Sequence, residues 1–168
     1  MAVTINGNGA VTGLTALPDA AMATGSVVQT VFGSTTTRVI NTDGNYMDSG
    51  VTATITPSSS SNKIMVIASM QWFLIREATE TDGNFKLLRG STAISTHTGA
   101  VHLEADTTGQ SRIISEGGYT IQVLDSPSTT SATTYKVQIA TNRTDNNAKM
   151  EVSRADAPSC ITLLEVVA

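Results

Sequence analysis

The sequence predicts an all-β protein folded as an antiparallel β-sandwich. Short runs of β-branched and apolar residues recur along the chain, separated by clusters of Gly, Pro, Ser, Asp and Asn, which is the spacing typical of a sandwich. Several runs alternate apolar and polar residues at period two, as half-buried strands do. Charged residues make up only 14% of the chain and no long helical periodicity appears, so solvated helices are not expected.

The composition also limits the classes of partner. The net charge is −4 and the ten Lys and Arg residues are spread along the chain, so no nucleic acid is expected to bind. No stretch reaches the roughly 20 apolar residues of a membrane helix, and the first residues lack the regions of a signal peptide. We therefore expect no membrane partner and synthesis in a cytoplasm. The single cysteine, Cys160, lies in an apolar run and is expected to be a small buried thiol.

Residues 1–25 are expected to form an extended N-terminal arm. They contain four glycines, one proline and no aromatic residue, so they cannot bury a core of their own. Gly-rich termini are ordered only when another part of the structure or a partner holds them. The arm is therefore a candidate attachment segment for a neighbouring subunit or protein. Its expected attachment residues are the apolar ones: Val3, Ile5, Val11, Leu14 and Leu17.

The β-sandwich is expected over residues 26–168, with its first strands at 26–32, 36–41 and 51–56. Val51, Ala53 and Ile55 alternate with Thr, which indicates one buried face. Turns are expected at residues 43–45 and 57–61, where Gly44, Pro57 and a run of Ser interrupt the strand pattern.

Residues 63–75 are apolar on both faces of the expected strand. Ile64, Val66, Ala68, Met70, Trp72 and Leu74 share one face, and Met65, Ile67, Phe73 and Ile75 lie on the other. A strand with one face in water should alternate cleanly, so this strand should be covered twice. The second sheet of the sandwich would cover the first face. We therefore predict a subunit interface over the second face, at Met65, Ile67, Phe73 and Ile75.

The remaining strands are expected at 84–89, 91–94, 112–115, 119–124, 133–141, 149–152 and 159–167. Asp82 and Gly83 form a typical hairpin-turn pair. The polar stretches 97–110 and 125–131 are expected to be loops. If the protein bound a receptor or a glycan, these two loops would form the tip that does so, because polar loops on a rigid scaffold suit recognition.

No motif indicates an enzyme or a bound cofactor. The glycines at positions 7, 9 and 13 are spaced G-x-G-x-x-x-G, which differs from the dinucleotide fingerprint, and neither a P-loop nor a nucleophile elbow occurs. If residues 100–106 are extended, His102, Glu104 and Asp106 lie on one face and are weak candidates for metal ligands. A solvated polar loop explains these three residues better than a metal site does. We expect no catalytic residues and no cofactor.

Three stretches resemble a virion domain of tailed bacteriophages, similar to modules of cyanophage tail-fibre and other virion surface proteins. They are ITPSSSSNKIMV at 55–66, LRGSTAI at 88–94 and LDSPSTTSATTYKV at 124–137. The resemblance extends from about Gly25 to the C-terminus, and parts of the arm resemble lead-in segments of such proteins. It implies a jelly-roll-like β-sandwich that forms a homotrimer and is located in the virion.

The chain departs from a typical fibre because no collagen-like run, coiled-coil heptad or β-helical repeat precedes the expected sandwich. The expected function is therefore a non-enzymatic structural protein that decorates or cements the capsid through its arm, with other virion proteins as partners. The alternative is a short tail-fibre or spike knob that binds a host receptor or surface glycan.

Overall fold

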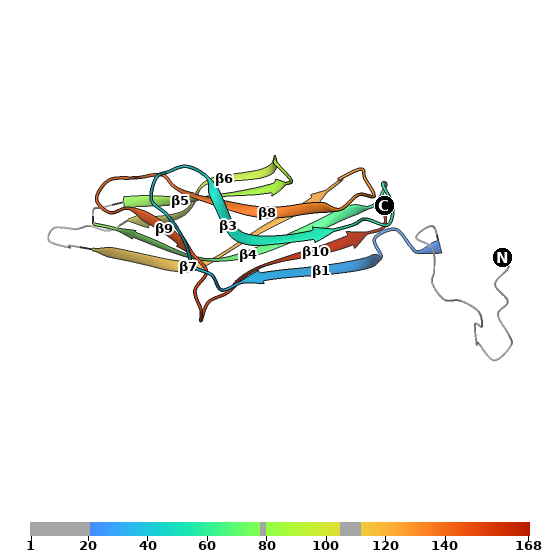
Figure 1. Ribbon diagram of the computed structural model, residues 1–168, viewed down its shortest axis with the longest axis horizontal. Coiled ribbons are helices and arrows are strands. Elements are labelled where there is room, and N and C mark those ends of the chain that lie inside the picture. Colours follow the sequence, from blue (N-terminus) through green and yellow to red (C-terminus); the bar gives the residue numbers. More distant parts are fainter. Residues whose placement is uncertain (1–20, 78–79, 105–111) are drawn as a thin grey trace.

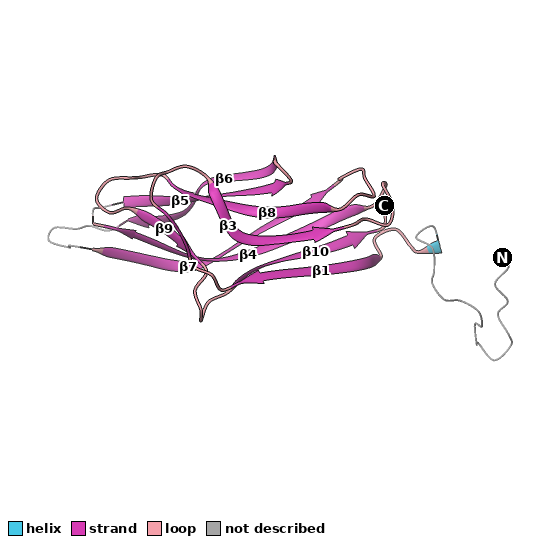
Figure 2. Ribbon diagram, in the orientation of Figure 1, coloured by secondary structure: helices cyan, strands magenta, loops and turns pink. Residues whose placement is uncertain are grey.

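The computed structural model describes residues 21–77, 80–104 and 112–168. These residues form ten strands arranged as two stacked antiparallel sheets (Figure 1 and Figure 2). The strands are β1 (Val27–Thr35), β2 (Val39–Asn41), β3 (Met47–Ile55), β4 (Lys63–Arg76), β5 (Glu80–Arg89), β6 (Thr92–Glu104), β7 (Ile113–Asp125), β8 (Thr133–Thr141), β9 (Lys149–Val152) and β10 (Ser159–Val166). The prediction of an all-β, jelly-roll-like antiparallel sandwich is confirmed.

The long strand β4 organises the larger, six-stranded sheet. One edge of β4 pairs with β7 from Ile64 to Arg76. The other edge pairs with β10 over residues 63–69 and with β9 over residues 72–75. Strand β1 continues the sheet beyond β10, and β2 continues it beyond β9. The smaller sheet has the order β3, β8, β5, β6.

The core lies between the two sheets and contains the face of β4 that was predicted to be buried. Ile64, Val66, Ala68 and Leu74 have essentially no exposed surface. They pack with Phe85, Tyr135 and other inward-facing side chains of the smaller sheet in one apolar cluster. Because strands alternate their side chains, the odd-numbered positions 65–75 of β4 lie on the outer face of the larger sheet.

The sandwich has two distinct ends. At the proximal end, the chain enters β1 and leaves β10: Gly25 N–H donates to the carbonyl of Val167 at 2.9 Å, and Val27 lies opposite Val166. At the distal end, β4 finishes and β5, β7 and β9 begin, so that Ile75 lies opposite Lys149. Both ends are visible in Figure 1, where the label C marks the proximal one.

One ion pair links the two sheets near the proximal end, and another holds a loop against the larger sheet near the distal end. Proximally, Arg89 of β5 lies 2.9 Å from the carboxylate of Asp125 of β7, which also accepts a 2.7 Å hydrogen bond from the Tyr135 hydroxyl. Distally, the buried guanidinium of Arg76 lies 3.0 Å from the carboxylate of Asp145. The proximal contacts join the sheets directly, because Arg89 and Tyr135 belong to the smaller sheet and Asp125 to the larger one.

Three local predictions were wrong. Asp82 and Gly83 are not a turn but lie within β5, where a Cβ at Gly83 would be 2.6 Å from Val101. The stretch from 97 to 104 was expected to be a loop but belongs to strand β6. Residues 113–125, expected as two strands, form the single strand β7. In each case pairing with a long neighbouring strand overrides the local turn or loop preference.

Candidate functional site

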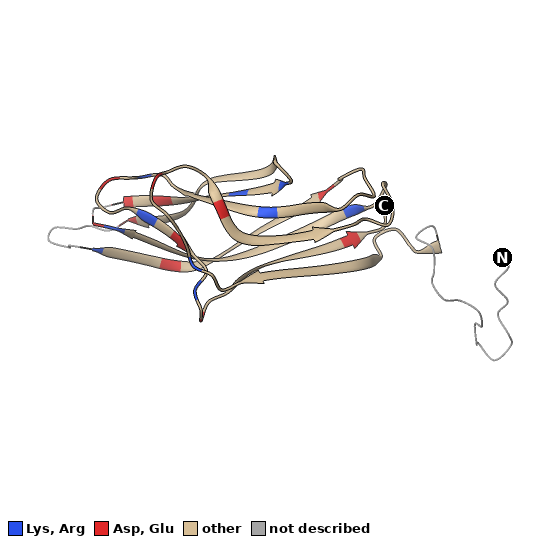
Figure 3. Ribbon diagram, in the orientation of Figure 1, with Lys and Arg blue, Asp and Glu red and all other residues tan. Residues whose placement is uncertain are grey.

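An exposed apolar surface covers the proximal half of the outer face of the larger sheet. Two rungs of residues cross β1, β10, β4 and β7 in that order: Phe32, Thr162, Ile67 and Gln122 in one, and Thr30, Leu164, Met65 and Leu124 in the other. We call Phe32, Met65, Ile67, Leu124 and Leu164 the outer patch. Phe32 is 63% exposed and Leu124 is 50% exposed, whereas the other three are half-buried. Neither rung contains a charged residue, and β1 carries none along its whole length (Figure 3).

The four residues predicted for a subunit interface do not share one environment. Met65 and Ile67 are half-buried and belong to the outer patch. Phe73 and Ile75 lie in the distal half of the same face and are buried within the chain, at 6% and 3% exposure. The guanidinium of Arg154 covers the ring of Phe73 at 3.4 Å. Phe73 and Ile75 therefore need no neighbouring subunit to remove them from water, and the interface itself stays a prediction.

The other members of the outer patch were missed by sequence reasoning. Phe32, Leu124 and Leu164 come from three strands that are distant in sequence from residues 63–75. Only the register of β1, β10 and β7 against β4 brings them together. The sequence signal that could have identified Phe32 is the alternation of its strand, in which Phe32 lies on the opposite face from Val31 and Gly33. Cys160 also lies on this outer face, opposite Ser69, and it is half-buried rather than buried as expected.

The distal half of the outer face carries a charged cluster around Glu151 of β9. The Glu151 side chain has no exposed surface and lies 2.5 Å from Arg38, 3.1 Å from Arg154 and 3.6 Å from Lys149. Burial by itself would raise the pKa of Glu151, but hydrogen bonds from Arg38 and Arg154 outweigh it, so the pKa lies below its ordinary value. Glu151 is thus shared by three cations, and two further carboxylates, Glu116 and Asp156, lie near Arg154 on the same part of the face.

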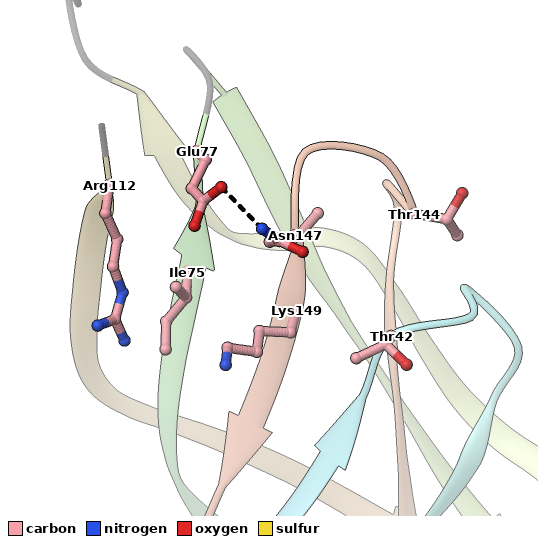
Figure 4. Close-up of a pocket in the computed structure, with 8 residues that line it drawn as sticks. Thr42, Ile75, Glu77, Arg112, Thr144, Asn147 and Lys149 are labelled. Atoms are coloured by element: carbon pink, nitrogen blue, oxygen red, sulfur yellow. Dashed lines mark hydrogen bonds between the residues drawn. The ribbon is translucent and has the colours of Figure 1, made fainter. Parts of the chain in front are cut away.

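A cavity of about 500 Å³ opens beside this cluster at the distal end, and we call it the distal pocket. It lies between the ends of β4 and β9 and the connecting loops (Figure 4). The carboxylate of Glu77 accepts a 2.7 Å hydrogen bond from the Asn147 side chain within it. The residues that line the pocket are Thr42, Ile75, Glu77, Arg112, Thr144, Asn147, Ala148 and Lys149.

Two of the three candidate metal ligands lie together. His102 and Glu104 share one face of β6, with His102 Nε2 3.6 Å from Glu104 Oε2. Asp106 lies outside the described residues. Sequence reasoning missed Asp82 of the paired strand β5, which contacts His102 Nδ1 and raises the pKa of the imidazole through that hydrogen bond. Within the described ranges, no three His, Cys, Asp or Glu side chains are grouped so that they could hold a metal ion.

A second histidine joins the two sheets along the side of the sandwich. His97 Nε2 lies 2.7 Å from Ser95 Oγ, and His97 Nδ1 lies 2.8 Å from the Tyr119 hydroxyl. The Tyr119 ring stacks on Phe85 with a centroid distance of 5.0 Å. This row links β6 to β7 and covers the core where the sheets meet, so packing accounts for the arrangement.

The predicted attachment arm lies largely outside the described residues, and this includes Val3, Ile5, Val11, Leu14 and Leu17. The arm joins the sandwich at the proximal end, where the amides of Gly25 and Val167 bond to the opposing chain segment. The prediction that the stretches 97–110 and 125–131 together form a binding tip is wrong. Strand β6 ends at the distal end, where Glu104 lies opposite Glu80, whereas β7 ends at the proximal end. The loop after Asp125 and the end of β6 therefore cannot form one binding site.

Comparisons with known proteins found only remote structural matches. No protein-family model and no curated protein sequence matches it. Eiger TNF from S. frugiperda aligns with 4% identity and a TM-score of 0.41, over 82% of this chain and 92% of that one. The VP2 subviral particle of infectious bursal disease virus aligns with 12% identity and a TM-score of 0.37, over 85% of this chain and 38% of the VP2 chain. Dimeric latent PorU from Porphyromonas gingivalis aligns with 7% identity and a TM-score of 0.36, over 86% of this chain and 14% of the PorU chain.

These similarities are too remote to indicate a function, and the chain spans well under half of the viral and PorU chains. In the part of the chain that the structure describes, no helix has the length and apolarity needed to cross a bilayer.

Proposed function

We propose that this protein is a non-enzymatic structural component of a bacteriophage particle and that it forms a homotrimer through the outer patch. The observation that carries the assembly is the patch itself, which exposes Phe32 and Leu124 beside Met65, Ile67 and Leu164 without an intervening charge. Contiguous exposed apolar surface of this kind is characteristic of protein contact sites. Burial of this surface on association stabilises the trimer by about 25 cal/mol per Å² of apolar area removed from water.

The place in a phage particle is inferred from the sequence, because the stretches at 55–66, 88–94 and 124–137 resemble virion surface domains. We propose that the sandwich decorates or cements the capsid and that the arm makes the attachment to other virion proteins. The chain enters the sandwich at the proximal end, next to the outer patch. Attachment and subunit contact would thus share one end, and the distal end would point away from the particle.

A charge placed in the outer patch tests the assembly. Ile67→Asp should convert the trimer to a folded monomer, because the carboxylate would be buried at the interface without a partner. Phe32→Asp should do the same, and because Phe32 is 63% exposed in the single chain, its replacement leaves the monomer fold intact. Met47→Asp is the matched control, since Met47 is 38% exposed but belongs to the smaller sheet. If Ile67→Asp and Phe32→Asp both kept the same oligomeric mass as Met47→Asp, the outer patch would not be the subunit interface.

Removal of residues 1–20 tests the attachment separately. The shortened protein should remain a trimer and keep its circular dichroism spectrum, because Gly25 and Val167 remain paired. It should no longer sediment with particles that lack the wild-type protein, whereas the full chain should. Undiminished sedimentation of the shortened protein would show that another surface makes the attachment.

A short tail-fibre or spike knob is the second candidate function. The distal pocket favours it, because a polar cavity at the end away from the arm is suitably placed to meet a ligand outside the particle. Particle images distinguish the two: capsid decoration predicts copies over the shell, and a knob predicts copies at the tail alone.

A further inference from the structure

The distal pocket has a mixed lining of charged, polar and apolar residues. It combines two cations, Arg112 and Lys149, with one carboxylate, Glu77, and with hydroxyl and amide groups. The walls come from the ends of β4 and β9 and from loops that are far apart in sequence (Figure 4). Convergence of several polar groups on one cavity is a general property of ligand sites.

Among residues 21–77, 80–104 and 112–168, no carboxylate forms an ion pair or hydrogen bond with Arg112. Lys149 lies 3.6 Å from Glu151, but that carboxylate is bound more closely by Arg38 and Arg154. The pocket lining therefore holds two cations and one carboxylate, which favours an anionic ligand. A planar guanidinium matches a carboxylate through two parallel hydrogen bonds.

Glu77 limits which anion fits. Its carboxylate accepts a hydrogen bond from the Asn147 side chain at 2.7 Å, and its backbone N–H donates to the carbonyl of Asn146 at 2.8 Å. A carboxylate in the lining repels a doubly charged phosphate group more strongly than a singly charged group. It also accepts hydrogen bonds from hydroxyl groups, and Thr42 and Thr144 add further hydroxyls to the lining. The ligand should therefore carry one negative charge and several hydroxyls.

Apolar atoms make up part of the pocket lining, which includes Ile75 and Ala148 beside the polar groups. A sugar ring presents hydroxyls at its edge and C–H groups on its faces, so it requires such a mixed lining. The volume of about 500 Å³ lies in the range of small-ligand sites, roughly 300–1,000 Å³.

We propose that the distal pocket binds a saccharide that carries a carboxylate, such as a uronic acid unit of a surface polysaccharide. Arg112 pairs with the carboxylate, and Lys149 adds to the positive potential around it. Glu77 and Asn147 bond to ring hydroxyls, and apolar atoms of the lining contact a face of the ring. This site does not depend on the outer patch, so it can be tested whether or not the chain forms a trimer.

The test is titration of the full-length protein with a galacturonic acid oligomer, followed by backbone amide NMR and by calorimetry. A neutral galactose oligomer and inorganic phosphate are the comparison probes. The wild type should bind the acidic oligomer with a dissociation constant of about 1 mM or tighter. The shifted amides should cluster at residues 144–149, and the two comparison probes should bind at least about tenfold more weakly.

Two variants assign the binding to the pocket. Arg112→Gln should weaken binding of the acidic oligomer by about tenfold or more, since a hydrogen bond to a charged group contributes about 1.5–3 kcal/mol. Arg143→Gln is the matched control, because Arg143 lies at the same end but pairs with Glu80 instead of lining the pocket. Equal weakening by both variants, equal binding of the neutral oligomer, tighter binding of phosphate, or no shift with the acidic oligomer would each overturn the proposal.

Discussion

Replacement of Gly33 by alanine should destabilise the sandwich by forcing the two sheets apart. Gly33 lies on the inner face of β1, where that strand passes close to β3 of the other sheet. A Cβ at this position would lie 2.2 Å from the carbonyl oxygen of Thr52 and 3.4 Å from the Cβ of Ala53. Ordinary contacts between carbon and oxygen are about 3.3–3.6 Å long. The obstacle is backbone, so no side-chain rotation can relieve it.

The size of the effect follows from that geometry. The sheets would have to separate locally by about 1 Å, and a gap of that size loses a quarter to a half of the dispersion energy of the contacts that it opens. Overpacking of a core by one methyl group typically costs about 1–3 kcal/mol, and a rigid obstacle places Gly33→Ala near 3 kcal/mol, the top of that range. For a chain of this length, such a loss lowers the melting temperature by about 6–12 °C.

Thermal unfolding at one protein concentration, followed by circular dichroism, measures the change. Gly118→Ala is the matched control, because a Cβ there would lie 3.7 Å from the side-chain nitrogen of Gln71, an ordinary contact. This control should be neutral or about 0.5 kcal/mol more stable, since alanine restricts the unfolded chain. If Gly33→Ala melted within about 2 °C of Gly118→Ala, the close packing of β1 on β3 would be refuted.

Three further predictions concern buried or perturbed polar groups. Tyr135→Phe should lower the free energy of unfolding by about 1–2 kcal/mol in urea denaturation, because the carboxylate of Asp125 loses its hydroxyl donor; an unchanged midpoint would contradict this. Since the pKa of Glu151 is lowered on folding, its contribution to stability is present above the ordinary value of 4.5 and is lost as the pH falls through the folded pKa. Glu151→Gln should therefore flatten the acid limb of the stability profile, and an unaltered limb would exclude Glu151 as its source. The pKa of His102 is raised, so its contribution is present below 6.5 and is lost as the pH rises through the folded pKa. Asp82→Asn should lower the pKa of His102 in an NMR titration, and an unmoved titration would show that Asp82 is not the cause.

The layered fold was accessible from the sequence because alternation identifies strands and their buried faces. The inward side chains of β4 were predicted individually, from Ile64 to Leu74, and all are buried. The predicted strand boundaries were wrong where local residues favour a turn but the segment pairs with neighbouring strands. Asp82 and Gly83 favour a turn, yet β5 is paired on both sides at Gly83, with Val101 and Thr141. The space that a side chain would need there is filled by Val101 and Met150.

The candidate sites were less accessible, because each depends on strand register. Met65 and Ile67 were found from their own strand, but their neighbours Phe32 and Leu164 lie on strands whose alignment with β4 no local pattern determines. Phe73 was expected to need a subunit as its cover. Arg154, about 80 residues further along the chain, provides that cover.

Sedimentation equilibrium of the wild-type, full-length protein tests the proposed assembly most directly. A trimer built through the outer patch predicts a mass of about 52 kDa at micromolar concentration, three times the 17.5 kDa of the chain. The mass should fall to that of one chain in Phe32→Asp. A wild-type protein that sediments at 17.5 kDa up to a concentration of about 100 μM would contradict the account.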